Sequence, residues 1–460
     1  MKKSFTLSGL AALLAMGAQA QSTNLTIPPS KIAVFKGGDA TGIYNISTAR
    51  VQPCFVQIYD TVTNNQAVPL VSVALPTNAP DGIWMNDHAG SEGGGISRSV
   101  NREFLALQGY TGNILSPTAA KPSSDTTVYR GFGVLDAFGN EHVIYSDLAN
   151  WFGLPPGVTQ NNPTGLATTD GTNFWGTGNV TGTSSEAAGT LFYNASVSST
   201  PLELQNYIQA AAEARIIGGT LYVVVPGQGV YNFLDPNNND AVVPLPYDPN
   251  VANPVEHIVL TNLFLNWGST FKNIANFDMN PQGTVAYGAD QTFGIVKFVN
   301  TTGVWQQAPY YFGSTNIGTA KQKVATQGCF GICVDFSGAN PIIYATTMET
   351  GTTPVNNAQG NPNQNRLIRI LDTGVNPGTN LVAQTLATAS TTNETFRGID
   401  FTPDLSPLIT SEPADYSTIN GGSASFSVTA DSVYALSYQW LQNSLVLANA
   451  TNAVLTLNNL

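Results

Sequence analysis

A strand–turn–strand pattern recurs along the chain and constrains its fold more than any other feature. The clearest copy is 329–347, where Cys-Phe-Gly-Ile-Cys-Val-Asp-Phe is followed by Ser-Gly-Ala-Asn-Pro and then by Ile-Ile-Tyr-Ala-Thr-Thr. Two β-branched or aromatic runs around such a turn predict a β-hairpin. Related copies lie at 96–107, 165–176, 214–225 and 274–288. Because one hairpin is only marginally stable, we expect the copies to pack as radially arranged four-stranded sheets, which is a β-propeller.

The spacing of these copies predicts an all-β propeller with six blades. Five of the blades are expected at 95–145, 165–214, 215–245, 274–312 and 329–387. The segment 202–214 within the second of these ranges has either a strand or a short helical pattern. A seventh blade is expected only if 251–267 forms a sheet of its own.

The remaining blade is expected to draw on both ends of the propeller sequence. Three strand-like runs at 31–35, 54–59 and 70–75 have no opening strand of their own, and the run 396–403 has no partners after it. Pairing these segments completes one four-stranded blade and closes the ring, which removes free sheet edges.

The first twenty residues have the features of a secretory signal peptide. Lys2 and Lys3 precede a short apolar run, and Ala18-Gln19-Ala20 has the small-x-small pattern of a cleavage site. No later stretch has the ~18 consecutive apolar residues that a membrane-spanning helix needs. We therefore expect an exported protein, secreted or at the cell surface, whose propeller domain occupies 21–405.

After residue 405 the pattern changes to that of a second, smaller domain. Alternating residues at 424–430 and the run around Trp440 resemble a bacterial immunoglobulin-like domain, with Trp440 as the core tryptophan of its third strand. The final strands of such a sandwich have no counterpart before Leu460. The prediction for 406–460 is therefore a truncated immunoglobulin-like β-sandwich.

The charge of the chain narrows the range of binding partners. The chain has a net charge of −12, and its 17 Lys and Arg residues form no basic patch. Nucleic acid is therefore an unexpected partner, and we expect a monomer that binds an extracellular polysaccharide or protein.

The three cysteines, Cys54, Cys329 and Cys333, allow one disulfide in an oxidising compartment, with the pairing open.

Several motifs together resemble a known group of proteins. The run Gly-Ser-Glu-Gly-Gly-Gly-Ile-Ser-Arg-Ser at 90–99, Phe-Leu-Ala-Leu-Gln-Gly-Tyr at 104–110 and Phe-Arg-Gly-Ile-Asp-Phe-Thr-Pro at 396–403 are the most distinctive. They resemble a family of secreted bacterial β-propeller proteins, often followed by immunoglobulin-like modules. The resemblance implies an architecture and a location, and it implies no reaction.

The candidate ligand-binding residues are Glu92, Arg98 and Arg397. The two arginines are expected on the innermost strands of adjacent blades, with Glu92 just before the first of these strands. Such charges near the ring axis could bind an anionic or sugar ligand. The alternative is a salt bridge that ties the closing blade to its neighbour.

Two weaker candidates lie in turns. Asp87, His88 and Glu92 bring carboxylates and an imidazole together within six residues, but the segment is Gly-rich, and a surface loop is the favoured interpretation. The segment 235–240, with Asp235 and Asp240, alternates oxygen-bearing residues as calcium loops do, but lacks their glycine and final acidic residue. Calcium is thus weakly indicated, and no other cofactor is.

The sequence leaves two functional interpretations. The first is a non-catalytic surface protein for adhesion or binding, since none of the common catalytic signatures is present. The second is an extracellular carbohydrate-active hydrolase or lyase that uses carboxylates at the mouth of the ring. A pocket with two or more convergent carboxylates would favour the enzyme, whereas a channel plugged by apolar side chains with only one salt bridge would favour the binding protein.

Overall fold

We analysed a computed structural model of the chain. It describes residues 25–41, 51–85, 93–116, 122–154, 156, 158–182, 189–197, 200–205, 211–235, 241–242, 260–268, 271, 273–312, 328–350, 353–354, 364–374, 383–391, 393–419, 421–432 and 434–458. Thr26–Pro403 forms one compact unit, and Asp404–Leu460 belongs to another.

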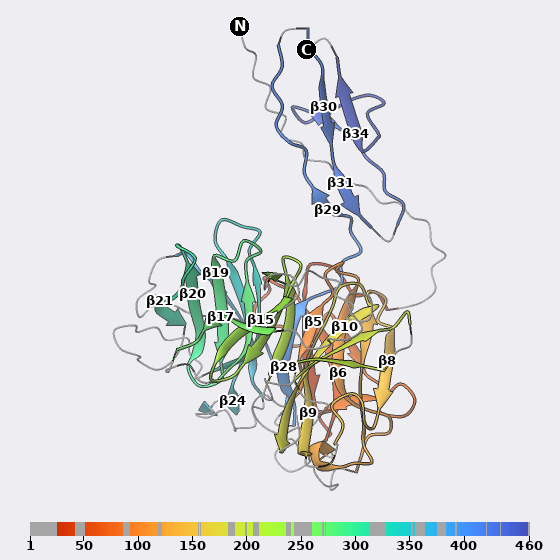
Figure 1. The fold of residues 1–460 in the computed structure, drawn as a ribbon, viewed down its shortest axis with the longest axis vertical. Helices are drawn as coiled ribbons and strands as arrows, with labels where there is room; N and C mark the ends of the chain where they lie inside the picture. Colours follow the sequence, from red (N-terminus) through yellow and green to blue (C-terminus); the bar gives the residue numbers. More distant parts are fainter. Residues whose placement is uncertain are drawn as a thin grey trace. The chain divides into compact units, whose positions relative to one another are not determined.

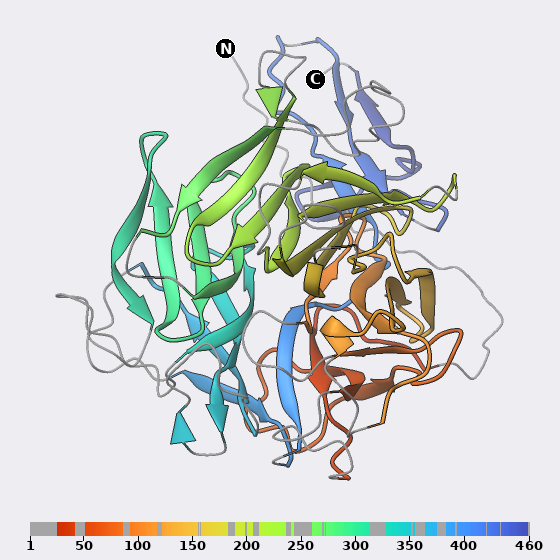
Figure 2. The ribbon, with the colours of Figure 1, turned by 60° about the horizontal axis from the view of Figure 1, so that its bottom comes forward.

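The larger unit is a β-propeller whose described strands form six antiparallel blades, two of which are joined into one sheet (Figures 1 and 2). Each blade contributes one innermost strand, and neighbouring innermost strands contact one another around a closed ring. In ring order these strands are β28 (Thr395–Phe401), β5 (Ile96–Arg98), β9 (Val158–Thr168), β13 (Glu213–Ile217), β18 (Ile274–Met279) and β22 (Cys329–Asp335).

The outer strands follow in chain order within each blade, as the hairpin pattern predicts. They are β1 (Ile32–Gly37), β2 (Gln52–Tyr59) and β3 (Val71–Ala74) after β28; β6 (Phe104–Thr111), β7 (Tyr129–Asp136) and β8 (Glu141–Asp147) after β5; β10 (Asn173–Gly182), β11 (Thr190–Asn194) and β12 (Leu202–Gln205) after β9; β14 (Thr220–Val225), β15 (Gly229–Asp235), β16 (Ala241–Val242) and β17 (Leu260–Asn266) after β13; β19 (Val285–Asp290), β20 (Gly294–Asn300) and β21 (Trp305–Phe312) after β18; and β23 (Ile342–Thr347), β26 (Arg366–Leu371) and β27 (Gln384–Thr388) after β22.

The closing blade is completed from both ends of the propeller sequence, which confirms the prediction. β28 pairs with β1 in the register Ile32↔Phe401, and β1 then pairs with β2. Figure 2 shows the light-blue β28 beside the red and orange strands of the N-terminal region. Because β28 is covered by β1 on one edge and by its ring neighbours on the other, no innermost strand is left as a free edge.

Two local features differ from the sequence interpretation. The short strand β4 (Ile83–Met85) was not predicted, and it joins β2 to β6, so that the first two blades form one continuous nine-stranded sheet. The segment 251–267 adds no seventh blade in the described residues, because β17 pairs with β15 and extends the fourth sheet. The helical alternative for 202–214 is wrong at both of its described ends, where β12 and β13 are extended.

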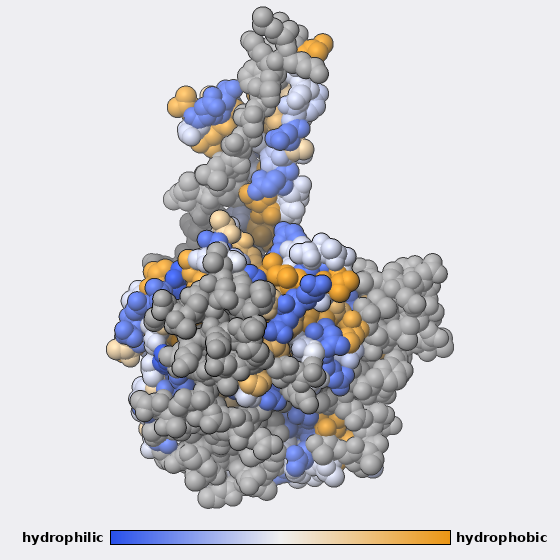
Figure 3. Space-filling model, turned by 90° about the vertical axis from the view of Figure 1, so that its left-hand side faces the viewer, coloured by the Kyte–Doolittle hydropathy of each residue, from blue (hydrophilic) through white to orange (hydrophobic). Residues whose placement is uncertain are grey.

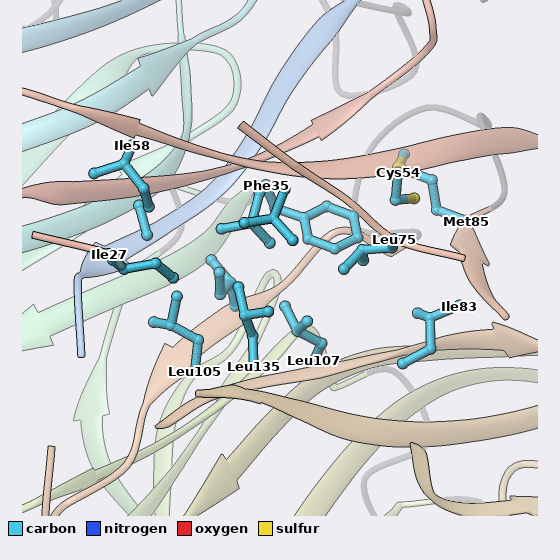
Figure 4. Close-up of a cluster of buried hydrophobic side chains, with 14 residues drawn as sticks. Ile27, Phe35, Cys54, Ile58, Leu75, Ile83, Met85, Leu105, Leu107 and Leu135 are labelled. Carbon is cyan, nitrogen blue, oxygen red and sulfur yellow. The ribbon is translucent and has the colours of Figure 1, made fainter. Parts of the chain in front are cut away.

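Apolar clusters between the blades provide the core. One of them packs Phe35 from β1, Cys54 from β2, Leu107 from β6 and Leu135 from β7 between the closing blade and its neighbour (Figure 4). Fully burying one such side chain contributes about 1.5–3 kcal/mol. The tryptophans Trp84, Trp151, Trp175 and Trp267 are likewise buried in hydrophobic clusters.

The three cysteines form no disulfide with one another, so none of the pairings that the sequence allows is formed. Cys54, Cys329 and Cys333 are each buried, and each lies in a different hydrophobic cluster. Cys329 and Cys333 are both on the extended strand β22, where residues four apart are separated by about 13 Å, beyond the reach of a disulfide.

The C-terminal unit consists of short strand pairs. They are β29 (Leu408–Ser411) with β31 (Thr429–Asp431), β30 (Ala424–Ser427) with β34 (Val454–Leu457), and β32 (Leu441–Gln442) with β33 (Leu445–Val446). Trp440 is buried with Phe426 and Leu455, and its Nε1 donates a hydrogen bond to Asn452 O at 2.8 Å. Trp440 thus lies in the core of this unit, next to a two-residue strand that is shorter than the predicted one.

Hydrophobic residues on the surface and long apolar helices are the features that would indicate contact with a membrane. On the face in Figure 3, the coloured hydrophobic residues are scattered in small groups among hydrophilic ones. Within the described part of the chain, no helix has the length and apolarity needed to cross a membrane.

Candidate functional site

The predicted ligand residues are only partly described. Glu92 lies outside the described residues, as do Asp87, His88 and all of the suggested calcium segment after Asp235. Among the described residues, no group of three or more His, Cys, Asp or Glu side chains is arranged to hold a metal ion.

Arg98 and Arg397 lie on adjacent innermost strands, but they have different surroundings. The backbone N–H of Arg98 donates to Asp400 Oδ2 at 2.9 Å, and its guanidinium lies 5.5 Å from the Phe401 ring centre. Arg397 is fully buried, with its guanidinium 5.2 Å from the Phe330 ring centre. A shared ligand for Glu92, Arg98 and Arg397 stays a prediction.

The structure instead brings together five polar side chains from three innermost strands, which we call the axial cluster. They are Glu213 and Arg215 on β13, Asn276 and Asp278 on β18, and Asp400 on β28. Residues two apart in a strand lie on the same face, so each of the first two strands supplies a pair of neighbouring polar groups. All five side chains are buried within the ring.

Arg215 is the centre of the axial cluster. Its Nη1 lies 3.6 Å from Asp278 Oδ2 and 3.6 Å from Asp400 Oδ2. Its Nη2 donates to the backbone oxygens of Ile332 at 2.9 Å and Ile399 at 3.4 Å. A single guanidinium of the fourth blade therefore links its own strand to β18, β22 and β28.

Backbone amides fix the two aspartates on either side of this arginine. Asp278 Oδ2 accepts a hydrogen bond from Val334 N at 2.8 Å, and Asp278 Oδ1 accepts one from Met279 N. Asp400 Oδ2 accepts from Arg98 N and Asp400 Oδ1 from Phe401 N at 2.7 Å. Such hydrogen bonds stabilise an ionised carboxylate and hold its orientation.

Glu213 and Asn276 form the deeper part of the cluster. Asn276 Nδ2 lies 3.4 Å from Glu213 Oε2, a long hydrogen bond. Immediately before β5, a Cβ added to Gly95 would lie 3.1 Å from Glu213 Oε2 and 2.5 Å from Thr164 O. Glycine at this position therefore lets β5 approach both its neighbouring strand and the Glu213 carboxyl.

Three polar atoms of the axial cluster have no hydrogen-bond partner although they are buried. These atoms are Glu213 Oε1, Asn276 Oδ1 and Arg215 Nε. Glu213 is 2% exposed and Asn276 is 1% exposed. Buried polar groups almost always have a partner, so three such atoms in one cluster require an explanation.

Burial separates the protonation states of the carboxyl groups. It raises the pKa of Glu213 to about 8, although Arg215 lowers this pKa, and nearby Asp400 raises it further. Burial also raises the pKa of Asp278 to about 6, against the lowering effect of Arg215. Of the two carboxyl groups, Glu213 therefore keeps its proton to the higher pH.

This arrangement combines the groups that acid–base chemistry requires. A protonated carboxyl can donate a proton, and an ionised carboxylate can accept one, when their surroundings move their pKa values apart. Asp278 and Asp400 retain small exposed fractions, 9% and 7%, whereas Glu213 lies deeper.

Sequence reasoning found the strands of this cluster but not its residues. Arg98 and Arg397 were selected as charged residues on innermost strands, and the same criterion would have selected Glu213, Arg215, Asp278 and Asp400. The signal was a charged residue inside an otherwise apolar strand, as in Ile-Ala-Asn-Phe-Asp-Met of β18. Their convergence depends on the ring closure, which places strands from distant parts of the sequence around one axis.

Comparison with known proteins adds little to this geometry. No protein-family model matches the sequence, and no curated protein matches it either. Among solved structures, a putative 6-phosphogluconolactonase from Bacteroides uniformis is similar at 14% identity and a TM-score of 0.37, covering 93% of this chain and 100% of that one. The periplasmic gluconolactonase PpgL of Pseudomonas aeruginosa is similar at 11% identity and a TM-score of 0.39, covering 81% and 99%. A protein from Lactobacillus plantarum has 10% identity and a TM-score of 0.36, with the same coverages. Similarity at this level carries no argument about activity.

Proposed function

We propose that this protein is a hydrolase that acts on a sugar-derived substrate through the axial cluster. The observation that carries the proposal is the convergence of three carboxyl groups, Glu213, Asp278 and Asp400, around Arg215. Among the described residues, the innermost strands thus bring several titratable groups together near the axis of the propeller. This is the outcome that favours the enzyme over the binding protein.

The roles follow from the protonation states. Glu213 donates its proton to the leaving oxygen as the bond from carbon to that oxygen breaks. Asp278 accepts a proton from the water molecule whose oxygen forms the new bond to the same carbon. Paired carboxyl groups in different protonation states carry out this chemistry on glycosidic bonds. Arg215 positions Asp278 and Asp400 through its two contacts of 3.6 Å.

A purely structural role for the cluster is the competing explanation, because Arg215 also links several blades. Both roles predict that Arg215 substitutions destabilise the fold. Only the catalytic role predicts that Glu213→Gln, which keeps the size of the protonated side chain, strongly lowers turnover without unfolding the protein.

The test is an assay of product release by the full chain on a panel of aldonolactones, glycosides and polysaccharides. We expect turnover of at least one class, with a loss of about 100-fold in both Glu213→Gln and Asp278→Asn. The matched control is Asp170→Asn, which removes a carboxylate from an exposed turn of the third blade. Retention of a polysaccharide without any product would contradict the enzyme and support the binding protein.

We further propose that the protein is exported and that its C-terminal unit is an immunoglobulin-like module. The pattern of the first twenty residues and the buried Trp440 support these two assignments. Cell fractionation combined with the intact mass of the mature chain tests export, since cleavage after Ala20 predicts a chain that begins at Gln21.

A further inference from the structure

The atoms without partners in the axial cluster indicate what a ligand must offer. Asn276 Oδ1 accepts hydrogen bonds, Arg215 Nε donates one, and Glu213 Oε1 can accept or, when protonated, donate one. An unmet hydrogen bond at a buried group costs about 1–3 kcal/mol. A ligand that places several donors and acceptors close together would remove this cost at all three atoms.

The charges of the cluster restrict the ligand further. Arg215 already faces two carboxylates, Asp278 and Asp400, at 3.6 Å each, and its Nη2 donates to backbone oxygens. Its positive charge is therefore balanced before any ligand binds. A phosphate or carboxylate placed here would lie against like charges in surroundings that screen them poorly.

The other described arginines near the axis do not change this balance. The guanidinium of Arg98 lies over Phe401, and its Nη1 is 3.4 Å from Thr402 O. Arg397 is on β28 three residues before Asp400, so the two side chains leave opposite faces of the strand, and its guanidinium lies over Phe330. Among the described residues, Asp278 and Asp400 thus face Arg215 with no second cation between them.

We infer that the axial cluster selects an uncharged polyhydroxylated substrate, a neutral sugar or sugar lactone, and rejects its phosphorylated and carboxylated counterparts. Hydroxyl groups of the substrate bind Asn276 Oδ1 and Glu213 Oε1, and one of its oxygens accepts the hydrogen bond of Arg215 Nε. Sites with buried polar groups discriminate strongly, because a wrong ligand leaves these groups without partners. The inference rests on the proposed function only in placing the substrate at this cluster.

The test compares matched neutral and anionic probes by isothermal titration calorimetry on the full chain. The probes are glucose against glucose 6-phosphate and glucuronate, and the same three compounds for galactose. At least one neutral sugar is expected to bind at least about tenfold more tightly than its anionic forms, a difference of about 1.4 kcal/mol. Equal or tighter binding of the anionic forms, or no binding of either neutral sugar, would overturn the inference.

Two variants connect the preference to the cluster. Asn276→Leu keeps the approximate size of the side chain and removes its oxygen, so it should weaken binding of the neutral sugar about tenfold. Asp400→Asn removes one negative charge and should reduce the discrimination against glucose 6-phosphate. The control Asp170→Asn removes a carboxylate that lies in an exposed turn and is not part of the axial cluster, so both affinities and their ratio should be unchanged. An unchanged ratio in Asp400→Asn would contradict the electrostatic argument.

The proposed hydrolase activity and the inferred ligand preference can be contradicted independently of each other. If neutral sugars bind and no product appears, the hydrolase is contradicted while the preference for uncharged ligands stands. If a phosphorylated substrate is hydrolysed, the hydrolase stands and the inferred preference is wrong.

Discussion

In two buried charge clusters of the propeller, the pKa values of the carboxyl groups are shifted in opposite directions. Between the fifth and sixth blades, Lys297 Nζ lies 2.7 Å from Asp372 Oδ2, and Tyr287 donates a hydrogen bond to the same carboxylate. Burial raises the pKa of Asp372, but the hydrogen bonds of Lys297 and Tyr287 outweigh burial and lower it overall. At the axis, burial dominates, and the pKa values of Glu213 and Asp278 are raised.

This difference in pKa shift distinguishes a stabilising ion pair from a candidate catalytic site. The carboxylate between the blades is matched by one cation at short distance, which is what the fold requires of a buried charge. The axial carboxyl groups share one guanidinium at 3.6 Å and leave polar atoms without partners. Perturbed titratable groups of this kind concentrate at functional sites, where stability is lost in exchange for reactivity.

The largest expected effect is on the matched cluster. Lys297→Met leaves the Asp372 carboxylate buried without its cation and should lower the free energy of unfolding by about 3 kcal/mol. Urea denaturation monitored by tryptophan fluorescence measures the change. A loss below about 1 kcal/mol, as for an exposed pair, would mean that this cluster is not stabilising and would remove the basis of the comparison.

Glu213→Gln tests the axial cluster through pH. The folded state holds the Glu213 proton up to about pH 8, whereas the unfolded chain releases it at the ordinary pKa of 4.5. The wild type should therefore lose stability as pH rises from about 4.5 to 8, because the unfolded state binds fewer protons over this range. Glu213→Gln should lack this part of the decline. Parallel curves for the two proteins in urea denaturation from pH 5 to 8 would show that Glu213 does not retain its proton.

A smaller effect on stability is expected for Asp278→Asn. The substitution removes a carboxylate whose buried charge is costly, but it also weakens the pairing with Arg215 and the hydrogen bond from Val334. These changes oppose each other, so the free energy of unfolding at pH 7 should change by less than about 1 kcal/mol. Destabilisation as large as that of Lys297→Met would place Asp278 with the structural ion pairs.

The smallest effect should come from an exposed ion pair. Lys31 Nζ lies 2.8 Å from Asp60 Oδ2, with side chains 28% and 18% exposed. Lys31→Met should cost no more than about 0.5 kcal/mol, since water screens such pairs. Thermal unfolding of this variant beside Lys297→Met gives the scale against which the buried clusters are judged.

Local sequence signals were sufficient for most of the blades. The runs around Gly218-Gly219 and around 337–341 form the predicted hairpins, because alternating β-branched residues and Gly, Asn or Pro turns act within a few residues. The closing blade was predictable from unpaired strands at both ends of the propeller sequence. The three-residue strand β4 was missed, since so short a run has no periodicity, and β17 was ambiguous, because its pattern fits either a new blade or an extension of the fourth.

The axial cluster depends on information that no local pattern contains. Glu213, Asp278 and Asp400 are separated by whole blades, and only closure of the ring brings their strands together. Asp400 appeared in the sequence interpretation only as part of a closing strand. The structure shows that this carboxylate faces Arg215, a contact between distant parts of the sequence that no local pattern indicates.

The central claim is that the axial cluster acts in chemistry and not in holding the ring together. Turnover and unfolding free energy measured side by side for the wild type, Asp278→Asn and Lys297→Met test it most directly. The account predicts that Asp278→Asn loses about 100-fold in turnover with nearly unchanged stability, while Lys297→Met loses stability and keeps its turnover below its unfolding transition. Full turnover in Asp278→Asn, or a loss that merely follows its unfolding, would contradict the account.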